Sequence, residues 1–201
     1  MFEEMINGSR AVLTNPSVAT FEEHERDNLQ WALIYSVCAG VINAILNAIR
    51  TTIFPQPIPP ELAELGITSG SGSIIVAIPI VIIFTTIGLL FYWGLTYALG
   101  KAFGGTGNFG ELTYDMALFS APMTIIGSAL GFIPFIGGLA GFVLFFYNLY
   151  LTYLAVQAGM NLPSNKAIYV IAIQFAIIFV LAVCIGFFVA AIFAAALSTS
   201  G

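Results

Sequence analysis

Four long stretches of this chain contain no charged residue, and they constrain its fold more than any other feature. They cover residues 28–49, 65–100, 116–165 and 167–201. A helix crosses the hydrocarbon core of a bilayer in about 20 residues, so each stretch is long enough to span it. Only 7% of the residues are charged, whereas a soluble domain has about 25%. The sequence therefore predicts an integral membrane protein.

The longest of these stretches must fold back on itself. It holds 50 residues, which would extend about 75 Å as one helix. The segment FIPFIGG interrupts it with Pro134, Gly137 and Gly138, residues that disfavour helix. We therefore expect an all-α fold, a bundle of five transmembrane helices at 30–50, 73–99, 112–132, 137–158 and 166–197. This divides the chain into a short cytoplasmic N-terminal segment with an amphipathic stretch and a five-helix transmembrane domain, at residues 1–29 and 30–201.

Two parts of this arrangement are unusual. The insert between the first two spans reads TTIFPQPIPPELAELGITSGSGS, and its prolines and its Gly/Ser-rich end predict an extended loop. The last span, 166–197, is about 46 Å long as a helix. It must tilt, bend near Gly186 or project beyond the membrane.

The few basic residues predict the orientation. Cytoplasmic connections of membrane proteins carry an excess of Lys and Arg. With the N-terminus inside, Arg50 alone is outside, and the bases inside are Arg10, Arg26, Lys101 and Lys166. N-in, C-out is therefore favoured. On that topology the cytoplasmic half holds nearly all Trp and Tyr residues, with Tyr147 near mid-membrane. Such a one-sided aromatic belt serves as a membrane anchor or as a docking surface.

No catalytic or cofactor constellation can be assembled from this sequence. The chain has one histidine, His24, and it lacks the glycine loops and nucleophile motifs that enzymes of common classes carry. We therefore expect no enzyme activity, no metal and no cofactor. The net charge is −5 and no basic block is present, so nucleic-acid binding is not expected either.

Two carboxylates open the third predicted span. Glu111 and Asp115 lie one helical turn apart on the same face. Acids in the first turn of a helix complement its dipole without any further function. Alternatively Asp115, one turn deeper, binds a cation or contacts a neighbouring helix, with Lys101 or Lys166 as its partner.

Small and polar residues predict helix contacts. The first span carries a stripe on one face, formed by Ser36, Gly40, Asn43 and Asn47. Gly127 and Gly131 form a similar pair in the third span. Such positions let helices approach closely and hydrogen-bond in lipid. We prefer this interpretation to a transport path, since no carboxylate lies at mid-membrane.

The order of these segments resembles the Yip family, five-span membrane proteins that interact with Ypt/Rab GTPases. The resemblance covers nearly the whole chain and rests on VLTNPSVATFEE, GGTGNFGELTYDMALFSAPMTIIG, FIPFIGG and YNLYLTYLAVQAGMNLPSNKA. It implies an N-in, C-out adaptor or organiser. The segment before the first span is short and lacks the acidic aromatic-Gly-Pro motif of eukaryotic members, which argues against GTPase binding. The chain is more similar to short prokaryotic members.

From the residues and the resemblance together, we expect a non-enzymatic membrane adaptor that works on its cytoplasmic side, in the cell membrane if the source is prokaryotic. Its partners would be membrane lipids, an unidentified membrane or cytoplasmic protein, and possible further copies of itself. Asn15, Pro16 and Phe21 stand at the start of the amphipathic stretch, where Asn15 and Pro16 could simply cap a helix. There are two alternatives. One is a small permease or transporter subunit that uses the carboxylates, and the other is a lipid-handling protein.

Overall fold

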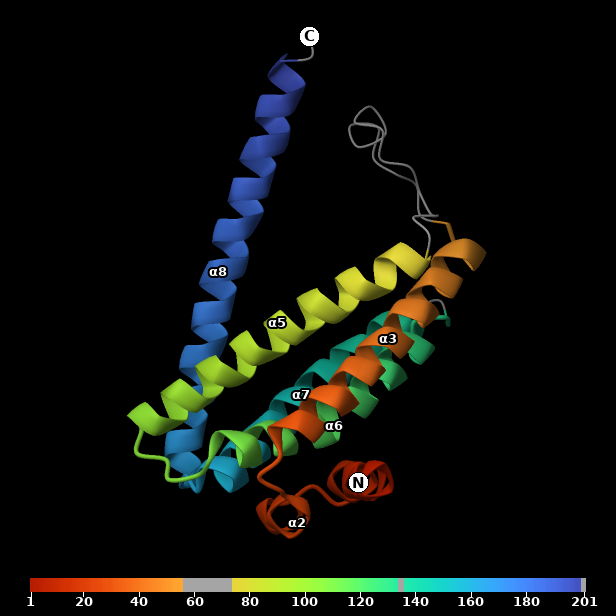
Figure 1. The fold of residues 1–201 in the computed structure, drawn as a ribbon. Coiled ribbons are helices and arrows are strands. Elements are labelled where there is room, and N and C mark those ends of the chain that lie inside the picture. Colours follow the sequence, from red (N-terminus) through yellow and green to blue (C-terminus); the bar gives the residue numbers. More distant parts are fainter. Residues whose placement is uncertain (56–73, 134–135, 200–201) are drawn as a thin grey trace.

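The structure, a computed structural model of the chain, describes residues 1–55, 74–133 and 136–199. Its described part is all-α and contains no strand. The helices, drawn in Figure 1, are α1 (Phe2–Thr14), α2 (Val18–His24), α3 (Leu29–Ile53), α5 (Ile74–Ala102), α6 (Phe109–Leu130), α7 (Ile136–Met160) and α8 (Ser164–Thr199). The five long helices, α3 and α5 to α8, coincide with the five predicted spans to within a few residues.

Within the described residues, four helices are long and apolar enough to cross a membrane. These candidate spans are Leu29–Ile53, Pro79–Ala102, Gly137–Met160 and Ser164–Ile192. Helix α6 lies outside this set. It carries Glu111 and Asp115 in its first two turns, and most of its N-terminal half is buried between its neighbours. The composition thus supports a polytopic helical membrane protein, while α6 differs in character from the other long helices.

The ends of the helices lie close to the sequence prediction, and the clearest difference is at the end of α3. Helix α3 continues through residues 51–53, which had been assigned to the loop, and the remainder of that predicted loop at 56–73 lies outside the described residues. At the predicted FIPFIGG turn, α6 ends at Leu130 and α7 begins at Ile136. Helix α8 is one continuous helix that includes Gly186.

The long helices form a bundle that opens at one end. In Figure 1, α3, α6 and α7 run side by side, α5 runs along one side of them at a small angle, and α8 diverges from the rest. Beyond Gln174, no described side chain of α8 is buried. Helices α1 and α2 lie across the other end of the bundle. We call that end the N-terminal face: it comprises α1, α2 and the connections 25–28, 103–108 and 161–163.

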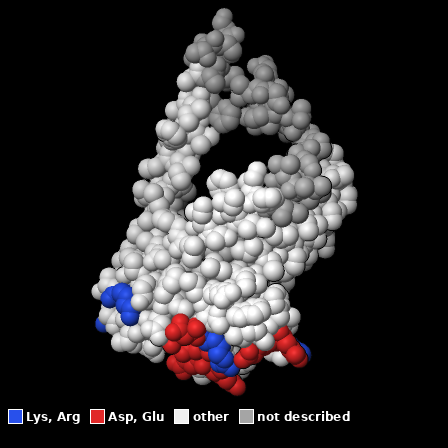
Figure 2. Space-filling view, in the orientation of Figure 1, with Lys and Arg blue, Asp and Glu red and all other residues white. Residues whose placement is uncertain are grey.

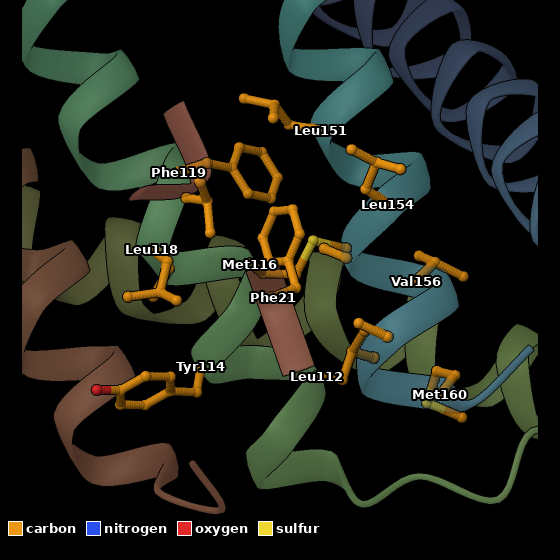
Figure 3. Close-up of a cluster of buried hydrophobic side chains, with 14 of the residues drawn as sticks. Phe21, Leu112, Tyr114, Met116, Leu118, Phe119, Leu151, Leu154, Val156 and Met160 are labelled. Atoms are coloured by element: carbon orange, nitrogen blue, oxygen red, sulfur yellow. The ribbon is translucent and has the colours of Figure 1, made fainter. Parts of the chain in front are cut away.

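The tightly packed core lies next to the N-terminal face. Figure 3 shows side chains of α6 and α7 meeting around Phe21 of α2. The rings of Phe21 and Phe119 pack edge to face, with centroids 6.2 Å apart, a favoured aromatic geometry. The hydrophobic effect can drive packing where water is near, whereas between lipid-exposed helices lipid tails are as apolar as the side chains. A dense core at the N-terminal face and exposed apolar helices beyond it follow from that difference.

Candidate functional site

Helix α1 is fixed to the bundle along one face. Its buried positions recur every three or four residues, at Met5, Gly8, Ser9 and Val12. Two tyrosines hold it by hydrogen bonds. The hydroxyls of Ser9 and Tyr35 of α3 are 3.0 Å apart, and the Tyr147 hydroxyl of α7 donates to the Leu13 carbonyl at 2.7 Å. Tyr147, expected near mid-membrane, therefore reaches the N-terminal segment.

Helix α2 begins two residues later than the capping prediction. Helix α1 ends at Thr14 with Asn15 as its C-cap, and Ser17 is the N-cap of α2. The Ser17 Oγ accepts the Thr20 N–H at 3.1 Å. The prediction of Asn15 as N-cap with Pro16 at the first helical position is therefore wrong. Proline is disfavoured after a helical residue, so Pro16 lies in the turn and a serine takes the cap.

The apolar side chains of the N-terminal segment point in two directions. Phe21 is 0% exposed, so it packs into the bundle and is not available to the membrane surface as expected. Helix α1 instead exposes Phe2 and Ile6. The Phe2 ring lies edge-on to Trp31 and Tyr35 of α3, with centroids 5.9 and 5.8 Å away. These exposed residues are the ones positioned to meet headgroups.

A glycine junction joins the α5–α6 connection to the end of α7. Thr106 donates its N–H to the Met160 carbonyl at 3.0 Å. A β-carbon on Gly107 would overlap the Gly159 carbonyl oxygen, so the two backbones touch. Helix α7 ends with Asn161 in the left-handed region, φ 51°, a conformation that asparagine tolerates at a helix C-terminus. The connection before α6 is therefore fixed in place.

Acidic side chains cluster where α2 and its following turn meet the start of α6. Figure 2 shows this acidic patch on the N-terminal face, with a basic side chain within it. We define the acidic patch as Glu22, Glu23, Glu25, Asp27 and Glu111. Burial raises the pKa of Glu25, the carboxylates of Glu111 and Glu22 raise it further, and Arg26 opposes the shift. A β-carbon on Gly110 would overlap Asp27 Oδ1, so the turn presses directly on α6.

Asp115 lies beneath this patch. It is 0% exposed, and neither of its carboxyl oxygens has a hydrogen-bond partner among the described residues. Its Oδ2 is 3.1 Å from where a β-carbon would stand on Gly159 of α7, so the carboxyl lies at the α6–α7 contact. An unpaired charge is costly in such a place. Within the described part of the chain, the nearby carboxylates do not come together as a metal site.

The predicted ion pair of Asp115 with a lysine is not present. Lys101 is exposed, its Nζ donates to the Thr106 carbonyl at 3.3 Å, and it lies 5.3 Å from the centroid of the Tyr97 ring. The Nζ of Lys166 lies instead beside Gly104 of the α5–α6 connection. Glu111 accepts the Asn108 N–H on its Oε2 at 2.9 Å and so caps α6. Both lysines lie at the rim of the face. The side chain of Asp115 points into the bundle instead, so it does not meet either lysine.

Comparison with known families agrees with this architecture. A family model, the Yip1 domain, matches residues 10–185. The chain belongs to the Yip family. It is an integral, multi-pass membrane protein, since several of its helices have the length and composition to cross a bilayer. No curated protein and no solved structure matches the chain.

The predicted small-polar stripe of this Yip-family protein lies along its helix contacts. A β-carbon on Gly40 of α3 would stand 3.2 Å from Thr85 of α5. Asn43 accepts a hydrogen bond from the Ser128 hydroxyl of α6, and Asn47 donates to Asn43 Oδ1 at 2.9 Å. Ser36 is buried, but its hydroxyl has no partner within the described residues.

The predicted glycine pair of α6 meets two different elements. A β-carbon on Gly127 would stand 3.8 Å from Leu144 of α7. At Gly131 it would stand 2.9 Å from Nη1 of Arg50. The Yip-family bundle therefore has Arg50 of α3 over the C-terminal end of α6, where a cation complements the helix dipole.

Sequence reasoning missed several residues of the face. Glu25 and Asp27 looked like part of a solvated charged run, and only the turn before α3 brings them onto α6. Tyr147 and Gly159 gave no local signal, because their partners lie more than 40 residues away in sequence. For these residues, the one sequence signal for the N-terminal face was the concentration of tyrosine and tryptophan at the helix ends that meet it.

Proposed function

We propose that this Yip-family protein is a non-enzymatic membrane adaptor that recruits a protein partner to its N-terminal face. The observation that carries the proposal is the platform of α1 and α2. It is held by Tyr35 and Tyr147, and the acidic patch lies on this end of the molecule. A segment serving only as a membrane anchor would need neither the fixed position nor the cluster of carboxylates.

The proposed topology has five spans with the N-terminal face in the cytoplasm. Helix α6 is the fifth span in this proposal, because it runs beside α3 and α7 and connects the end of α5 to the start of α7. Its 22 residues extend about 33 Å as a helix, sufficient for the hydrocarbon core. Orientation is supported by the bases Arg10, Arg26, Lys101 and Lys166, which lie on or next to the elements of this face, while Arg50 lies in the last turn of α3.

The chemistry of the face favours a basic partner segment. Glu22, Glu23 and Asp27 are exposed, so they keep their hydration until a partner arrives. Complementary charge accelerates association and selects orientation. Because the α1–α2 platform is already ordered by its contacts with α3, α6 and α7, binding costs less conformational entropy than at a flexible tail.

The permease alternative has less support. It would use the inner-face carboxylates, but Glu111 caps α6, and among the described residues the carboxylates do not gather as a cation site. We therefore do not assign a transport role to the carboxylates.

Photo-crosslinking in cells tests the proposal. A photoreactive residue at Glu23, which is exposed on the acidic patch, is compared with one at Phe142, 63% exposed on the apolar surface of α7. We expect the same protein partner at Glu23 in replicate experiments, joined through a segment rich in Lys or Arg, and only lipid at Phe142. Capture of lipid alone at both positions, or of one protein equally at both, would contradict the adaptor function.

A further inference from the structure

An open cavity lies on the other half of the bundle, away from the N-terminal face. Its volume is about 640 Å³, within the range of small-molecule sites. Its walls come from all five long helices, α3 and α5 to α8. Phe175 and Ile178 of α8 belong to its lining, and α8 diverges from the bundle in Figure 1.

One wall of this cavity is polar, which is unusual at membrane depth. Each of three helices contributes two polar residues three or four positions apart, namely Asn47 and Arg50, Thr124 and Ser128, and Asn148 and Thr152. That spacing aligns them along the cavity side of each helix. The hydroxyl of Thr124, which is exposed, donates to the Ser120 carbonyl of its own helix at 2.8 Å, so its oxygen can still accept a hydrogen bond.

The remaining lining of the cavity is mainly apolar. It includes Leu144 and Phe145 of α7 and Phe175 and Ile178 of α8, and the rings of Phe145 and Phe175 pack edge to face with centroids 6.5 Å apart. A soluble anion would gain nothing from these four side chains, and a hydrocarbon would leave the polar wall unpaired. The cavity therefore fits an amphiphile, which has both a polar and an apolar part.

Arg50 decides the charge of that amphiphile. Among the described residues no carboxylate forms an ion pair with it. Its Nη1 lies over Gly131 at the end of α6, a contact that engages one end of the guanidinium. An arginine carries five N–H donors, so donors remain for a phosphate, which arginine binds in a bidentate manner.

We propose that this cavity binds an anionic phospholipid, with its phosphate at Arg50 and an acyl chain along the apolar side chains that α7 and α8 contribute to the lining. The polar wall of α3, α6 and α7 then meets the glycerol and ester region. The bound lipid fills the cavity, and it joins α8 to the remainder of the bundle.

Two glycines of α7 provide a matched test. Gly141 lines the cavity and Gly138 does not, and a β-carbon at either would meet no heavy atom within 4 Å. Gly141→Leu therefore fills the cavity with little direct effect on packing, and Gly138→Leu is the control for helix propensity and added apolar surface. Arg50→Gln removes the phosphate contact, with Lys166→Gln as the control for loss of one positive charge on the N-terminal face.

Native mass spectrometry of the delipidated full-length protein measures the outcome, with phosphatidylglycerol and phosphatidylcholine as probes. We expect preferential retention of phosphatidylglycerol, reduced at least about fivefold by Gly141→Leu and Arg50→Gln, which corresponds to about 1 kcal/mol. The two control variants should behave as the parent, and excess inorganic phosphate should not displace the lipid. Equal retention of the two lipids by the parent, displacement by phosphate, or equal behaviour of Gly141→Leu and Gly138→Leu would overturn the proposal.

Discussion

The carboxyl of Asp115 on α6 lies directly against Gly159 of α7, with Oδ2 3.1 Å from the position of an added β-carbon. The same β-carbon would stand 2.7 Å from Leu112 Cα. Because backbone atoms cannot move aside as a flexible side chain can, Gly159→Ala must separate α6 from α7. We expect a loss of about 1–3 kcal/mol in the free energy of unfolding, the usual cost of overpacking.

Thermal unfolding in detergent checks this effect against Gly138→Ala. A β-carbon on Gly138 meets no atom within 4 Å, and alanine is favoured over glycine inside a helix by about 0.5–1 kcal/mol. The control should therefore melt at or slightly above the parent temperature. A Gly159→Ala protein as stable as that control would mean that the two helices are not in close contact.

Neutralising the two carboxylates of α6 should give different results. Glu111→Gln keeps an oxygen that accepts the Asn108 N–H, so the cap survives and stability changes little. Asp115→Asn replaces an unpaired buried carboxyl with a neutral amide of similar shape, which is less costly to bury. We expect a higher melting temperature for Asp115→Asn. A lower one would indicate that a bound cation or donor stabilises the carboxylate.

Docking of the turn after α2 should depend on pH through Glu25. Its pKa in the folded protein is raised above 4.5, chiefly by burial and then by Glu111 and Glu22. The folded state therefore binds its proton more tightly than the unfolded state, so this contribution to stability is present below about pH 4.5 and is lost as the pH rises through the folded pKa. Melting temperatures across this window should show less pH dependence for Glu25→Gln. An unchanged profile would exclude Glu25 as the group responsible.

Removal of the Tyr147 hydroxyl should loosen α1. Tyr147→Phe deletes the hydrogen bond to the Leu13 carbonyl, worth about 0.5–1.5 kcal/mol. Hydrogen–deuterium exchange should become faster across Phe2–Thr14 while α6 stays protected. Tyr150→Phe is the control, since Tyr150 is 45% exposed on the same helix. Equal exchange in the two variants would show that the tyrosine does not hold the platform.

The long helices could be predicted from sequence because a helix that spans a membrane needs about 20 mostly apolar residues. Runs without charge and a proline-glycine break located α3 and α5 to α8 to within a few residues. The caps of the short helices were less predictable, since Asn15 and Ser17 are both good cap residues and the choice depends on how α1 and α2 fit the bundle.

The site was less predictable than the fold. Glu111 and Asp115 were recognised, but their environments are set by residues that are distant in sequence, such as Gly159. Spacing placed both acids on one face of α6 and could not show that one caps the helix while the other is buried. The cavity at Arg50 had no sequence signature, because its walls come from all five long helices.

The most direct test of the account measures whether the acidic patch itself captures the partner. The crosslink yield at Ala19, which is exposed on α2 about one turn before Glu22 and Glu23, is compared between the parent and a Glu22→Lys/Glu23→Lys variant, with the melting temperature as the control for folding. These three side chains are exposed, so folding should be unaffected. The account predicts that the parent yields one protein partner and that the charge reversal abolishes at least about nine-tenths of this crosslink, an effect of about 1.4 kcal/mol or more. An undiminished crosslink in the charge-reversed protein would contradict it.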